Sequence, residues 1–493
     1  MAFSKKLLFG FFLLLQFVAV ITVSNAAINP IAVYVDKDHP SASDSNNGSA
    51  STPWKSLQHG LNQLTAGSHL YVKKSVEPYY GPYRLRGTNV GGFTINVNGT
   101  ASSPIVVEGY PGERPVINQK RGLSSLLTTG EADSATKALA GFYIHQGDYL
   151  TIRNFEITQT SFSGIMTNPG PFRPSVYITI ENMLIHHLYA DPVYGRDNLG
   201  GIRIDHTNFC TIRNNVIHDI YTSRTVGNSY TSEQYSFHSG IHGFRPGGCI
   251  IENNLIYNVA KGVYQKTASY EDKDSNEVRK NIFYNIDDVT YFVGVQGAGV
   301  RAAYNAKFHD NIVYNANGGV RAKVYETSAQ SRGMEIYNNT FYNVSDAISI
   351  TGMTDVKVYN NIFDTVTNLI FALQDPTGYG NVNSATQFDN NLYFNSQLLW
   401  ALDRYGANSQ FLRSLSDWQN AISRSSTESL VSSPDSRSIV AAPQYIDAGN
   451  LDFSLKGTSP AKGAGINGED IGAYGNFSFV GPGNLPKSPT EFR

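Results

Sequence analysis

A short segment recurs along this chain and carries basic or aromatic side chains at fixed places. It opens with glycine or alanine followed by an apolar residue, and it is found at residues 201–205, 240–244, 262–266, 299–303, 319–323 and 347–351. Its third place holds Arg203, His242, Tyr264, Arg301 and Arg321, and its fifth holds Asp205, Phe244, Lys266, Ala303 and Lys323. Arginines stacked in one column repel each other unless an anion binds between them. A lysine beside such cations becomes a competent base if its pKa falls, so this surface could bind an anion and remove a proton.

The elements that would position these side chains are the strands of a coil. Each segment is followed, after a variable loop, by an asparagine and then two apolar or β-branched residues. These asparagines are Asn215, Asn254, Asn281, Asn311, Asn339 and Asn361. The intervals between these asparagines are unequal although the flanking strands are alike. Such spacing is typical of a solenoid, because insertions leave at the corners and the stacked strands keep their register. The sequence therefore predicts an all-β fold, a parallel β-helix.

Strand alternation divides the segment into an inward and an outward set of side chains. The inward columns are predicted to be Ile202, Ile241, Val263, Val300, Val320 and Ile348, and then Ile204, Ala302, Ala322 and Ile350. The third and fifth places are expected to face solvent. Asparagine tolerates the left-handed backbone of a tight corner and can stack as a ladder. The predicted corner positions are Asn154, Asn182, Asn214, Asn253, Asn338 and Asn360.

Length and charge are compatible with one long solenoid. The 493 residues include 38 basic and 40 acidic side chains, so the total charge indicates no general role in binding nucleic acid. Leu57, Leu61 and Leu64 have helical spacing, and a helix over residues 54–64 is expected to cover the first coil. A second helix is expected over residues 411–422. The predicted organisation is a signal peptide at 1–26, the β-helix with its N-terminal cap at 27–400, and further coils with a small C-terminal cap at 401–493.

Residues 1–26 have the pattern of a secretory signal peptide. Lys5 and Lys6 precede an apolar run, and the small residues 24–26 form a cleavage site. A retained membrane anchor is the alternative, but the run is short and contains Gln16. We therefore expect a secreted or periplasmic protein without membrane contact once the signal is removed.

Two cysteines occupy equivalent places in consecutive coils. Cys210 follows Gly201 at the same interval as Cys249 follows Gly240. Equivalent positions on stacked strands lie about 4.8 Å apart, which allows either a disulfide bond in an oxidising compartment or two buried thiols. Both interpretations place the residues side by side in the interior, and neither supplies enough ligands for a metal site.

Several motifs are similar to those of right-handed parallel β-helix proteins that act on polysaccharides. They are residues 52–56 (Thr-Pro-Trp-Lys-Ser), residues 104–115, the coils that read Asn-Asn-X-Ile/Phe-Tyr-Asn, and residues 459–460 with 470–473. The resemblance extends over nearly the whole chain after residue 26 and implies a right-handed parallel β-helix. Within this group the outward columns resemble polysaccharide lyases of the chondroitinase B and alginate lyase type. The motifs are characteristic of the fold more than of the reaction, because many activities share such coils.

The resemblance implies a lysine base on one coil and an arginine on the next, which here are Lys266 and Arg301 as catalytic residues. A lyase of this type removes the proton at carbon 5 of a uronate and expels the 4-linked oxygen, so it needs a base and a cation that neutralises the carboxylate. His242 and Tyr264 are alternative bases, or acids for the leaving group. The residues expected to bind an acidic polysaccharide are Arg203, His242, Arg245, Tyr264, Arg321 and Lys323.

Calcium is the one cofactor that this resemblance raises. The paired glutamates of those lyases are absent, since Tyr264 stands where one is expected. Glu271, Asp272 and Asp274 could bind calcium, although a solvated acidic loop is the simpler interpretation. The metal site is therefore left unassigned, and the protein is expected to act as a monomer.

Two other functions stay open at this point. A glycoside hydrolase of the polygalacturonase type needs carboxylates that converge on the glycosidic oxygen, and the outward columns supply Asp205 and few others. A non-catalytic carbohydrate-binding or adhesive solenoid is favoured if the outward columns do not line a closed groove. Long insertions at residues 221–239 and 268–276 are predicted to form the walls of such a groove.

Overall fold

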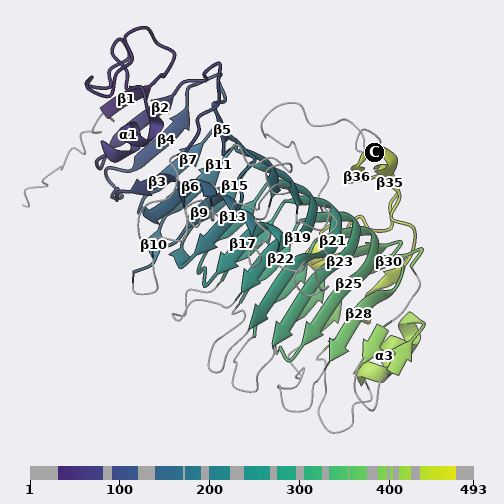
Figure 1. Ribbon diagram of the computed structural model, residues 1–493. Helices are drawn as coiled ribbons and strands as arrows, with labels where there is room; N and C mark the ends of the chain where they lie inside the picture. The colour runs from purple at the N-terminus through teal and green to yellow at the C-terminus, as the bar shows by residue number, and fades with distance from the viewer. Residues whose placement is uncertain are drawn as a thin grey trace, which may run out of the picture.

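The chain folds into a parallel β-helix whose coils follow one another along a single axis (Figure 1). The computed structural model describes residues 31–81, 91–119, 139–169, 173–189, 199–221, 238–266, 275–295, 305–324, 332–353, 355–374, 387–396, 400–402, 410–423 and 433–473. The expected signal peptide lies outside these residues. Among them, no helix is both long enough and apolar enough to cross a membrane.

Each complete coil contributes to three faces. The first face is a sheet of 13 strands, all paired in parallel. Its strands are β1 (Ile31–Val35), β2 (Ser68–Val72), β4 (Ile105–Gly109), β7 (Leu150–Arg153), β11 (Ile178–Glu181), β15 (Thr211–Arg213), β18 (Ile250–Glu252), β20 (Glu277–Arg279), β22 (Lys307–His309), β24 (Glu335–Tyr337), β26 (Lys357–Tyr359), β29 (Gln387–Asp389) and β33 (Ser433–Pro434).

The second and third faces belong to one sheet, because four long strands bend around the corner between them. These are β19 (Leu255–Lys266), β21 (Ile282–Val295), β23 (Ile312–Val324) and β25 (Thr340–Thr351). Other coils use separate strands. On the second face they are β5 (Val116–Asn118), β8 (Glu156–Thr158), β12 (Leu184–Tyr189), β16 (Val216–Tyr221), β27 (Ile362–Asp364), β30 (Leu392–Phe394) and β34 (Ile439–Val440). On the third face they are β3 (Gly91–Asn96), β6 (Leu139–Gln146), β9 (Ser163–Thr167), β13 (Gly200–Asp205), β17 (Ser239–Phe244), β28 (Leu369–Gln374) and β31 (Trp400–Leu402).

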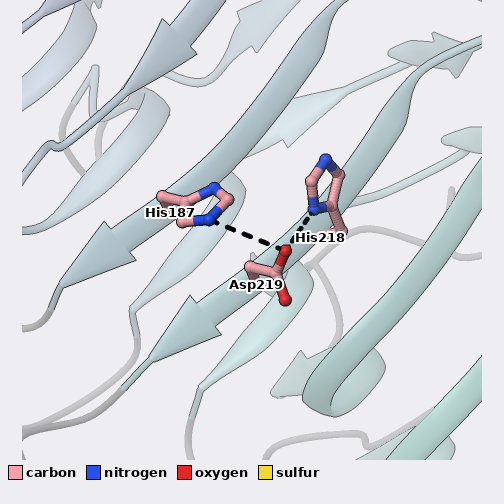
Figure 2. Close-up of side chains that lie close together, drawn as sticks. All are labelled: His187, His218 and Asp219. Carbon is pink, nitrogen blue, oxygen red and sulfur yellow. Dashed lines mark hydrogen bonds and ion pairs between the residues drawn. The ribbon is translucent and has the colours of Figure 1, made fainter. Parts of the chain in front are cut away.

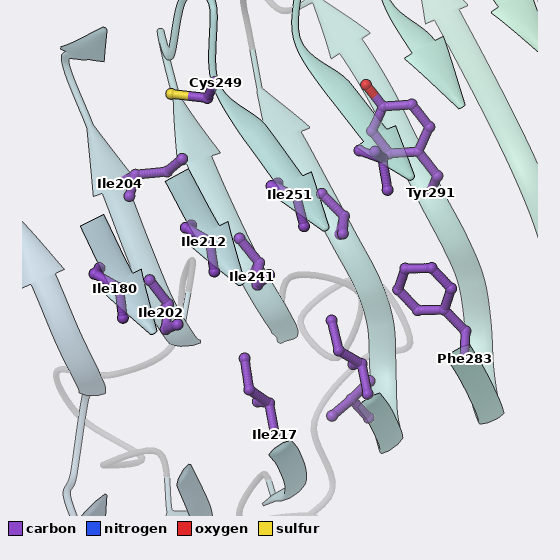
Figure 3. Close-up of a cluster of buried hydrophobic side chains, with 14 of the residues drawn as sticks. Ile180, Ile202, Ile204, Ile212, Ile217, Ile241, Cys249, Ile251, Phe283 and Tyr291 are labelled. Atoms are coloured by element: carbon purple, nitrogen blue, oxygen red, sulfur yellow. The ribbon is translucent and has the colours of Figure 1, made fainter. Parts of the chain in front are cut away.

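Apolar side chains from all three faces meet in the interior (Figure 3). Ile202 pairs with Ile241, and Ile241 with Val263, as the inward column predicted. Glycine opens the segment because the backbone passes close to the second face. A Cβ on Gly240 would lie 2.5 Å from Cγ2 of Ile256.

One strand of the predicted repeat is wrong. The places expected for Val300 and Ala302 are held by Tyr291 and Val293 of β21, which pair with Val263 and Gln265 on one side. The pattern missed this strand because a tyrosine stands in the aliphatic column. Tyr291 is completely buried, and its hydroxyl lies 3.1 Å from Oε1 of Gln265, which satisfies the polar group inside the core.

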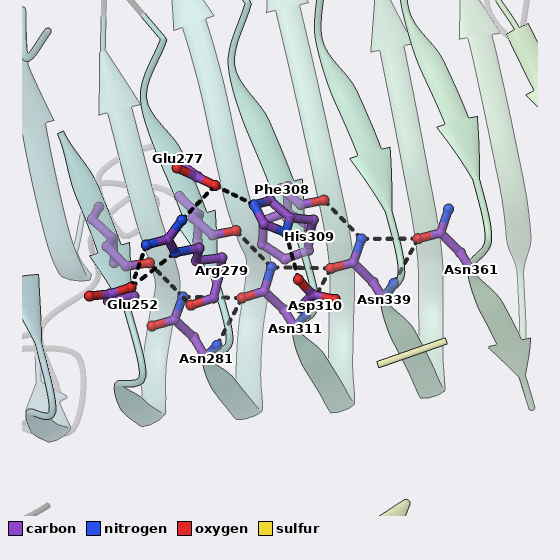
Figure 4. Close-up of polar contacts among 12 residues, drawn as sticks. Glu252, Glu277, Arg279, Asn281, Phe308, His309, Asp310, Asn311, Asn339 and Asn361 are labelled. Carbon is purple, nitrogen blue, oxygen red and sulfur yellow. Dashed lines mark hydrogen bonds and ion pairs between the residues drawn. The ribbon is translucent and has the colours of Figure 1, made fainter. Parts of the chain in front are cut away.

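The asparagines form two sets at the corners. The predicted corner residues all have left-handed φ values between +53° and +66°. The residue after each corner is also asparagine in most coils and points inward, where it is shielded from solvent (Figure 4). Nδ2 of Asn281 donates to Oδ1 of Asn311 at 3.1 Å, and Nδ2 of Asn311 donates to Oδ1 of Asn339 at 3.1 Å. This ladder satisfies the buried amides and fixes the register between coils.

Charges on the outside of the first face neutralise one another. One column alternates in sign along the coils and consists of Glu108, Arg153, Glu181, Arg213, Glu252 and Arg279. Arg279 contacts both Glu252 and Glu277, and Glu277 contacts His309 (Figure 4). The first face therefore presents no excess of one charge, in contrast to the third.

Further elements close the ends and one side. Helix α1 (Leu57–Asn62) buries Leu57 and Leu61 on the first coil, as expected, and α3 (Leu415–Ser423) packs Trp418 against Trp400 at the other end. Strand β32 (Gln410–Leu412) pairs antiparallel with β31 there. Two small pairings are parallel β10 (Ser175–Val176) with β14 (Thr207–Asn208), and antiparallel β35 (Tyr445–Asp447) with β36 (Asp452–Leu455); the short helices η3 (Ala448–Asn450) and η4 (Ile466–Gly468) complete the set.

The C-terminal segment from β35 onwards runs back along the second face, as Figure 1 shows for β35 and β36. The ring centroid of Phe453 is 5.3 Å from that of Tyr342, and the backbone nitrogen of Ile466 donates to Oδ1 of Asn360 at 2.9 Å. Aromatic side chains stacked outside the second face give it an apolar surface on which to pack.

The cysteine prediction is confirmed in its geometric part. Cys210 and Cys249 lie side by side on consecutive coils, and each is 1% exposed. The structure records a disulfide bond between them. Of the two interpretations left open by the sequence, the bonded one is therefore the one observed.

Candidate active site

The third face gathers most of the predicted site residues. Register pairs place Arg203 of β13 beside His242 of β17, and His242 beside Tyr264 of β19. Lys266 lies at the end of β19, beside Phe244. Arg245 directly follows β17; its backbone nitrogen donates to the carbonyl oxygen of Lys266 at 3.2 Å, and its guanidinium carbon is 5.1 Å from the ring centroid of Phe244. Arg321 and Lys323 lie on β23, two strands further on.

The neighbour predicted for Lys266 was wrong. Gly294 of β21 pairs with Lys266 on one side and with Lys323 on the other, where Ala303 was expected. Phe292 likewise lies between Tyr264 and Arg321, in the place expected for Arg301. Arg301 itself is outside the described residues, and so are Glu271, Asp272 and Asp274 and most of both insertions that were predicted as groove walls.

The outward columns are also less exposed than alternation alone predicted. His242 is 1% exposed and Tyr264 is 4% exposed, whereas Arg203, Lys266, Arg321 and Lys323 are half-buried. The aromatic rings cover one another along the column. The ring centroids of His242 and Tyr264 are 5.0 Å apart, and those of Tyr264 and Phe292 are also 5.0 Å apart. The surface therefore consists of aromatic rings that contact one another, with cationic side chains around them.

A buried lysine that the sequence reasoning missed lies on this face, where β19 enters it from the second face. Lys261 of β19 is 3% exposed, and its ammonium nitrogen is 2.5 Å from Oδ2 of Asp288. Oδ1 of the same carboxylate accepts from Nη1 of Arg321 at 3.0 Å. The ammonium group also lies 5.5 Å from the ring centroid of Tyr264. A signal was present in the sequence, because Ser239 and Gly200 stand at the equivalent place on the two preceding coils.

Burial and the neighbouring charges set the protonation states here. Burial lowers the pKa of Lys261, and Arg321 lowers it further, while Asp288 acts in the opposite direction. Burial alone would raise the pKa of Asp288, but Lys261 and Arg321 outweigh it and hold that pKa below its usual value. Asp288 is therefore an ionised carboxylate that is paired with two cations.

Two histidines on this face are neutral at pH 7. Burial, and then the charge of Lys261, lowers the pKa of His238 to about 4. Burial together with the charges of Arg203, Lys266 and Lys261 holds the pKa of His242 well below its ordinary value. The Nδ1 atoms of both rings are buried, with no hydrogen-bond partner among the described residues.

Asp205 is the second carboxylate of the surface. Its Oδ2 accepts from Nε of Arg203 at 2.9 Å and from Nη2 of the same guanidinium at 2.7 Å. Arg203 also lies with its guanidinium carbon 5.2 Å from the ring centroid of Phe162. Burial, and to a smaller extent the charge of Asp205, raises the pKa of nearby Tyr143.

We call this region of the third face the basic surface. Its members are Arg203, Asp205, His238, His242, Lys261, Tyr264, Lys266, Asp288, Phe292, Arg321 and Lys323.

Comparison with known proteins supports the fold. A family model described as a right handed beta helix region matches residues 140–330, which begin in β6 and extend beyond β23. The hand expected from the sequence resemblance is thereby confirmed. No curated protein matches this chain in sequence.

Solved structures with some similarity include a pectate lyase, an alginate lyase and a polygalacturonase. A pectate lyase, Pel9A, is 15% identical with a TM-score of 0.46, and the match covers 92% of this chain and 98% of that one. For an alginate lyase from Paenibacillus sp. str. FPU-7 the identity is 18%, the TM-score 0.35, and the coverage 59% and 94%. For a polygalacturonase from Erwinia carotovora ssp. carotovora these values are 13%, 0.43, 76% and 95%. Similarities at this level assign no reaction, so the basic surface has to supply the evidence for one.

Proposed function

We propose that this protein is a secreted enzyme that cleaves an acidic, uronate-containing polysaccharide by β-elimination at the basic surface. The observation that carries the proposal is the state of the two carboxylates. Asp205 is bound to Arg203, and Asp288 is bound to both Lys261 and Arg321. A hydrolase needs carboxyl groups that act on the glycosidic bond as acid and as base or nucleophile. Carboxylates held in ion pairs are poorly suited to those roles, whereas an excess of cations suits an anionic substrate.

Lys266 is the proposed base. It is half-buried at the end of β19, and its ammonium group forms no hydrogen bond or ion pair with any described residue. That separates it from Lys261, which is fixed by Asp288. In its amine form Lys266 would take the proton from carbon 5 of the uronate. The electron pair of that bond then forms the double bond between carbons 4 and 5, the bond from carbon 4 to its oxygen breaks, and the departing oxygen takes a proton from Tyr264 or water.

Arginine is proposed to neutralise the uronate carboxylate, which makes the proton at carbon 5 more acidic. Arg321 uses Nη1 for Asp288, so Lys261 and Asp288 hold its guanidinium in place through one nitrogen. Planar guanidinium groups bind carboxylates through two parallel hydrogen bonds, which suits this role. Arg203 and Lys323 are proposed to bind neighbouring acidic sugars, together with Arg245. Arg301 stays a candidate for the same task from the sequence.

His242 is the alternative base. Its pKa lies well below the ordinary histidine value, so the ring is neutral at the pH where a base is required. Its position between Arg203 and Tyr264 would bring it close to a sugar that lies along the column. Substituting Lys266 and His242 in separate variants distinguishes the two candidate bases.

The test is a screen of purified full-length protein against polygalacturonate, alginate, rhamnogalacturonan and chondroitin sulfate. β-Elimination produces an unsaturated uronate, which absorbs in the ultraviolet and appears together with new reducing ends. We expect both signals on at least one of these polymers. New reducing ends without the absorbance would overturn the proposal in favour of a hydrolase. Binding of a polymer without any new ends would favour a non-catalytic carbohydrate-binding solenoid.

A further inference from the structure

A second cluster of ionisable side chains lies on the second face, where β12 and β16 turn (Figure 2). Among the described residues, His187, His218 and Asp219 are the one group of three whose ligand atoms all lie within 4.8 Å of one another. Nε2 of His187 is 4.0 Å from Oδ2 of Asp219, and Nδ1 of His218 is 2.6 Å from the same oxygen. We propose that these three side chains bind a divalent transition-metal ion of the zinc type, which replaces the proton that Nδ1 of His218 donates to Asp219 and releases it to solvent.

The set of donor atoms selects the metal. Two imidazole nitrogens and one carboxylate oxygen are typical zinc ligands, at about 2.0–2.2 Å from the ion. Calcium prefers six to eight oxygen ligands and is disfavoured by this set. The side chain of His187 is 45% exposed, so water can complete the coordination. His187 and Asp219 lie on consecutive coils, so the ion would link β12 to β16.

Neighbouring groups orient the ligands in the way that metal sites require. Nδ1 of His187 is 2.7 Å from Nδ1 of His186, and Nε2 of His186 is 3.3 Å from Oε1 of Glu156. A carboxylate only accepts hydrogen bonds, so the proton of His186 belongs on Nε2, and the shared proton between the rings belongs on Nδ1 of His187. This leaves the lone pair of His187 on Nε2, the atom that faces Asp219. Carboxylate–histidine relays of this kind hold the ligands of known metal sites.

The partner of Asp219 on the other side is an amide. Oδ1 of Asp219 accepts from Nδ2 of Asn258 at 2.9 Å, so Oδ2 is the oxygen directed at the two histidines. His218 is held between two flat rings, since its ring centroid is 5.2 Å from that of His186 and 4.5 Å from that of Tyr257. Both contacts restrict the ligand atoms to one arrangement.

The residue types change at this corner in two coils. In the following coils the corner residues are Asn258, Asn285, Asn315 and Asn343, with φ between +50° and +52°. His187 and Asp219 have the same left-handed backbone, at +51° and +54°. His187 and Asp219 thus stand in neighbouring coils at the position where the later coils have asparagine. His218 stands at the position where the next coil has Tyr257. An asparagine ladder would suffice for a structural corner, so the ligating residue types indicate a separate role.

The same comparison supplies the test variants. His187→Asn and Asp219→Asn each insert the residue that later coils carry in the same backbone conformation, so both proteins are expected to fold. Chelator-treated full-length protein is titrated with zinc chloride by calorimetry, and thermal unfolding is recorded with and without zinc. We expect the parent to gain thermal stability with zinc. Each variant should bind zinc at least ~10-fold more weakly, by analogy with the loss seen for weaker perturbations of metal sites. His39→Asn, which changes a histidine far from this corner in sequence, should bind as the parent does.

Glu156→Gln provides a second variant, because it leaves all three ligands in place. It should also weaken zinc binding by ~10-fold, since glutamine no longer fixes the proton on His186. Cobalt(II) as a substitute ion should give the visible absorption of a site with few ligands in the parent alone. Equal zinc affinity of the parent and Asp219→Asn, absence of zinc binding by the parent, or preference for calcium over zinc would each overturn the proposal. None of these results depends on whether the protein cleaves a polysaccharide.

Discussion

Lys261 and Asp288 form an ion pair between neighbouring coils, with Nζ 2.5 Å from Oδ2. The two partners are buried to different degrees, because the side chain of Lys261 is 4% exposed and that of Asp288 is 28% exposed. Asp288 has a second cation in Arg321. The two partners therefore contribute unequally to the stability of the third face. Asp288 also holds Arg321, the arginine that is proposed to bind substrate.

Loss of Asp288 should destabilise the protein more than loss of Lys261. Asp288→Ala removes the carboxylate that Lys261 and Arg321 share, and we expect the free energy of unfolding to fall by about 3 kcal/mol. Lys261→Met leaves Asp288 bound to Arg321, so its effect should be smaller. Urea denaturation of both variants measures this order. The double variant Lys261→Met/Asp288→Ala should be more stable than Asp288→Ala alone, and the reverse order would contradict the assignment.

Lys266→Ala should lower turnover of the cleaved polysaccharide by at least ~100-fold, the lower range for removal of a general base. The melting temperature should hardly change, because the Lys266 side chain forms no hydrogen bond or ion pair with any described residue and carries little packing energy. Initial rates of ultraviolet absorbance measure the effect. Lys357→Ala, on the first face, is the matched control and should keep the activity of the parent. Retention of most activity by Lys266→Ala, together with its loss in His242→Ala, would move the role of base to His242.

Asn311→Ala should destabilise the ladder of inward asparagines. The side chain is completely buried; its Nδ2 donates to the carbonyl oxygen of Val278 at 2.9 Å, and its Oδ1 accepts from the backbone nitrogen of Asn281 at 3.0 Å. Both partners would lose a hydrogen bond away from water, which costs about 3 kcal/mol or more in total. Asn317→Ala removes an exposed amide that bonds to a backbone carbonyl and is the control. Equal denaturation midpoints for the two variants would argue against the ladder as a source of stability.

The protein should become less stable as the pH falls from 6.5 to 4, because buried His238 resists protonation in the folded state. Its pKa is lowered to about 4 by burial and by Lys261, so the unfolded chain binds the proton first over this range. The contribution present above pH 6.5 is lost on acidification and amounts to about 3 kcal/mol. His238→Gln should flatten the pH dependence of the unfolding free energy.

Asp435 contributes with the opposite sign in an overlapping range. Burial raises its pKa to about 6, so its contribution is complete below the unfolded value and is lost as the pH rises through 6. Parent and His238→Gln protein must therefore be compared at each pH, because this background is common to both. The prediction fails if the difference between them is the same at pH 4 and at pH 7.

The sequence alone determined the features that repeat locally. The period of two along each strand separates Ile202 from Arg203, and the recurring asparagines locate the corners, because a left-handed backbone restricts which residues fit there. Stacking of equivalent positions then places Cys210 beside Cys249 whatever the lengths of the loops between them. These properties depend on neighbours within one coil or on the coil repeat, so they are visible in a single sequence.

Tertiary structure alone decided which strand faces which, and what is buried outside the sheet. Residues 299–303 fit the local pattern as well as residues 290–294, but β21 places Tyr291 in the core, where Gln265 satisfies its hydroxyl. Loop lengths do not fix such a register, because the hydrogen bonds and packing of the neighbouring coils select it. For the same reason the pairing of Lys261 with Asp288, 27 residues apart, and the contact of His187 with Asp219 on the next coil appear only when the coils are stacked.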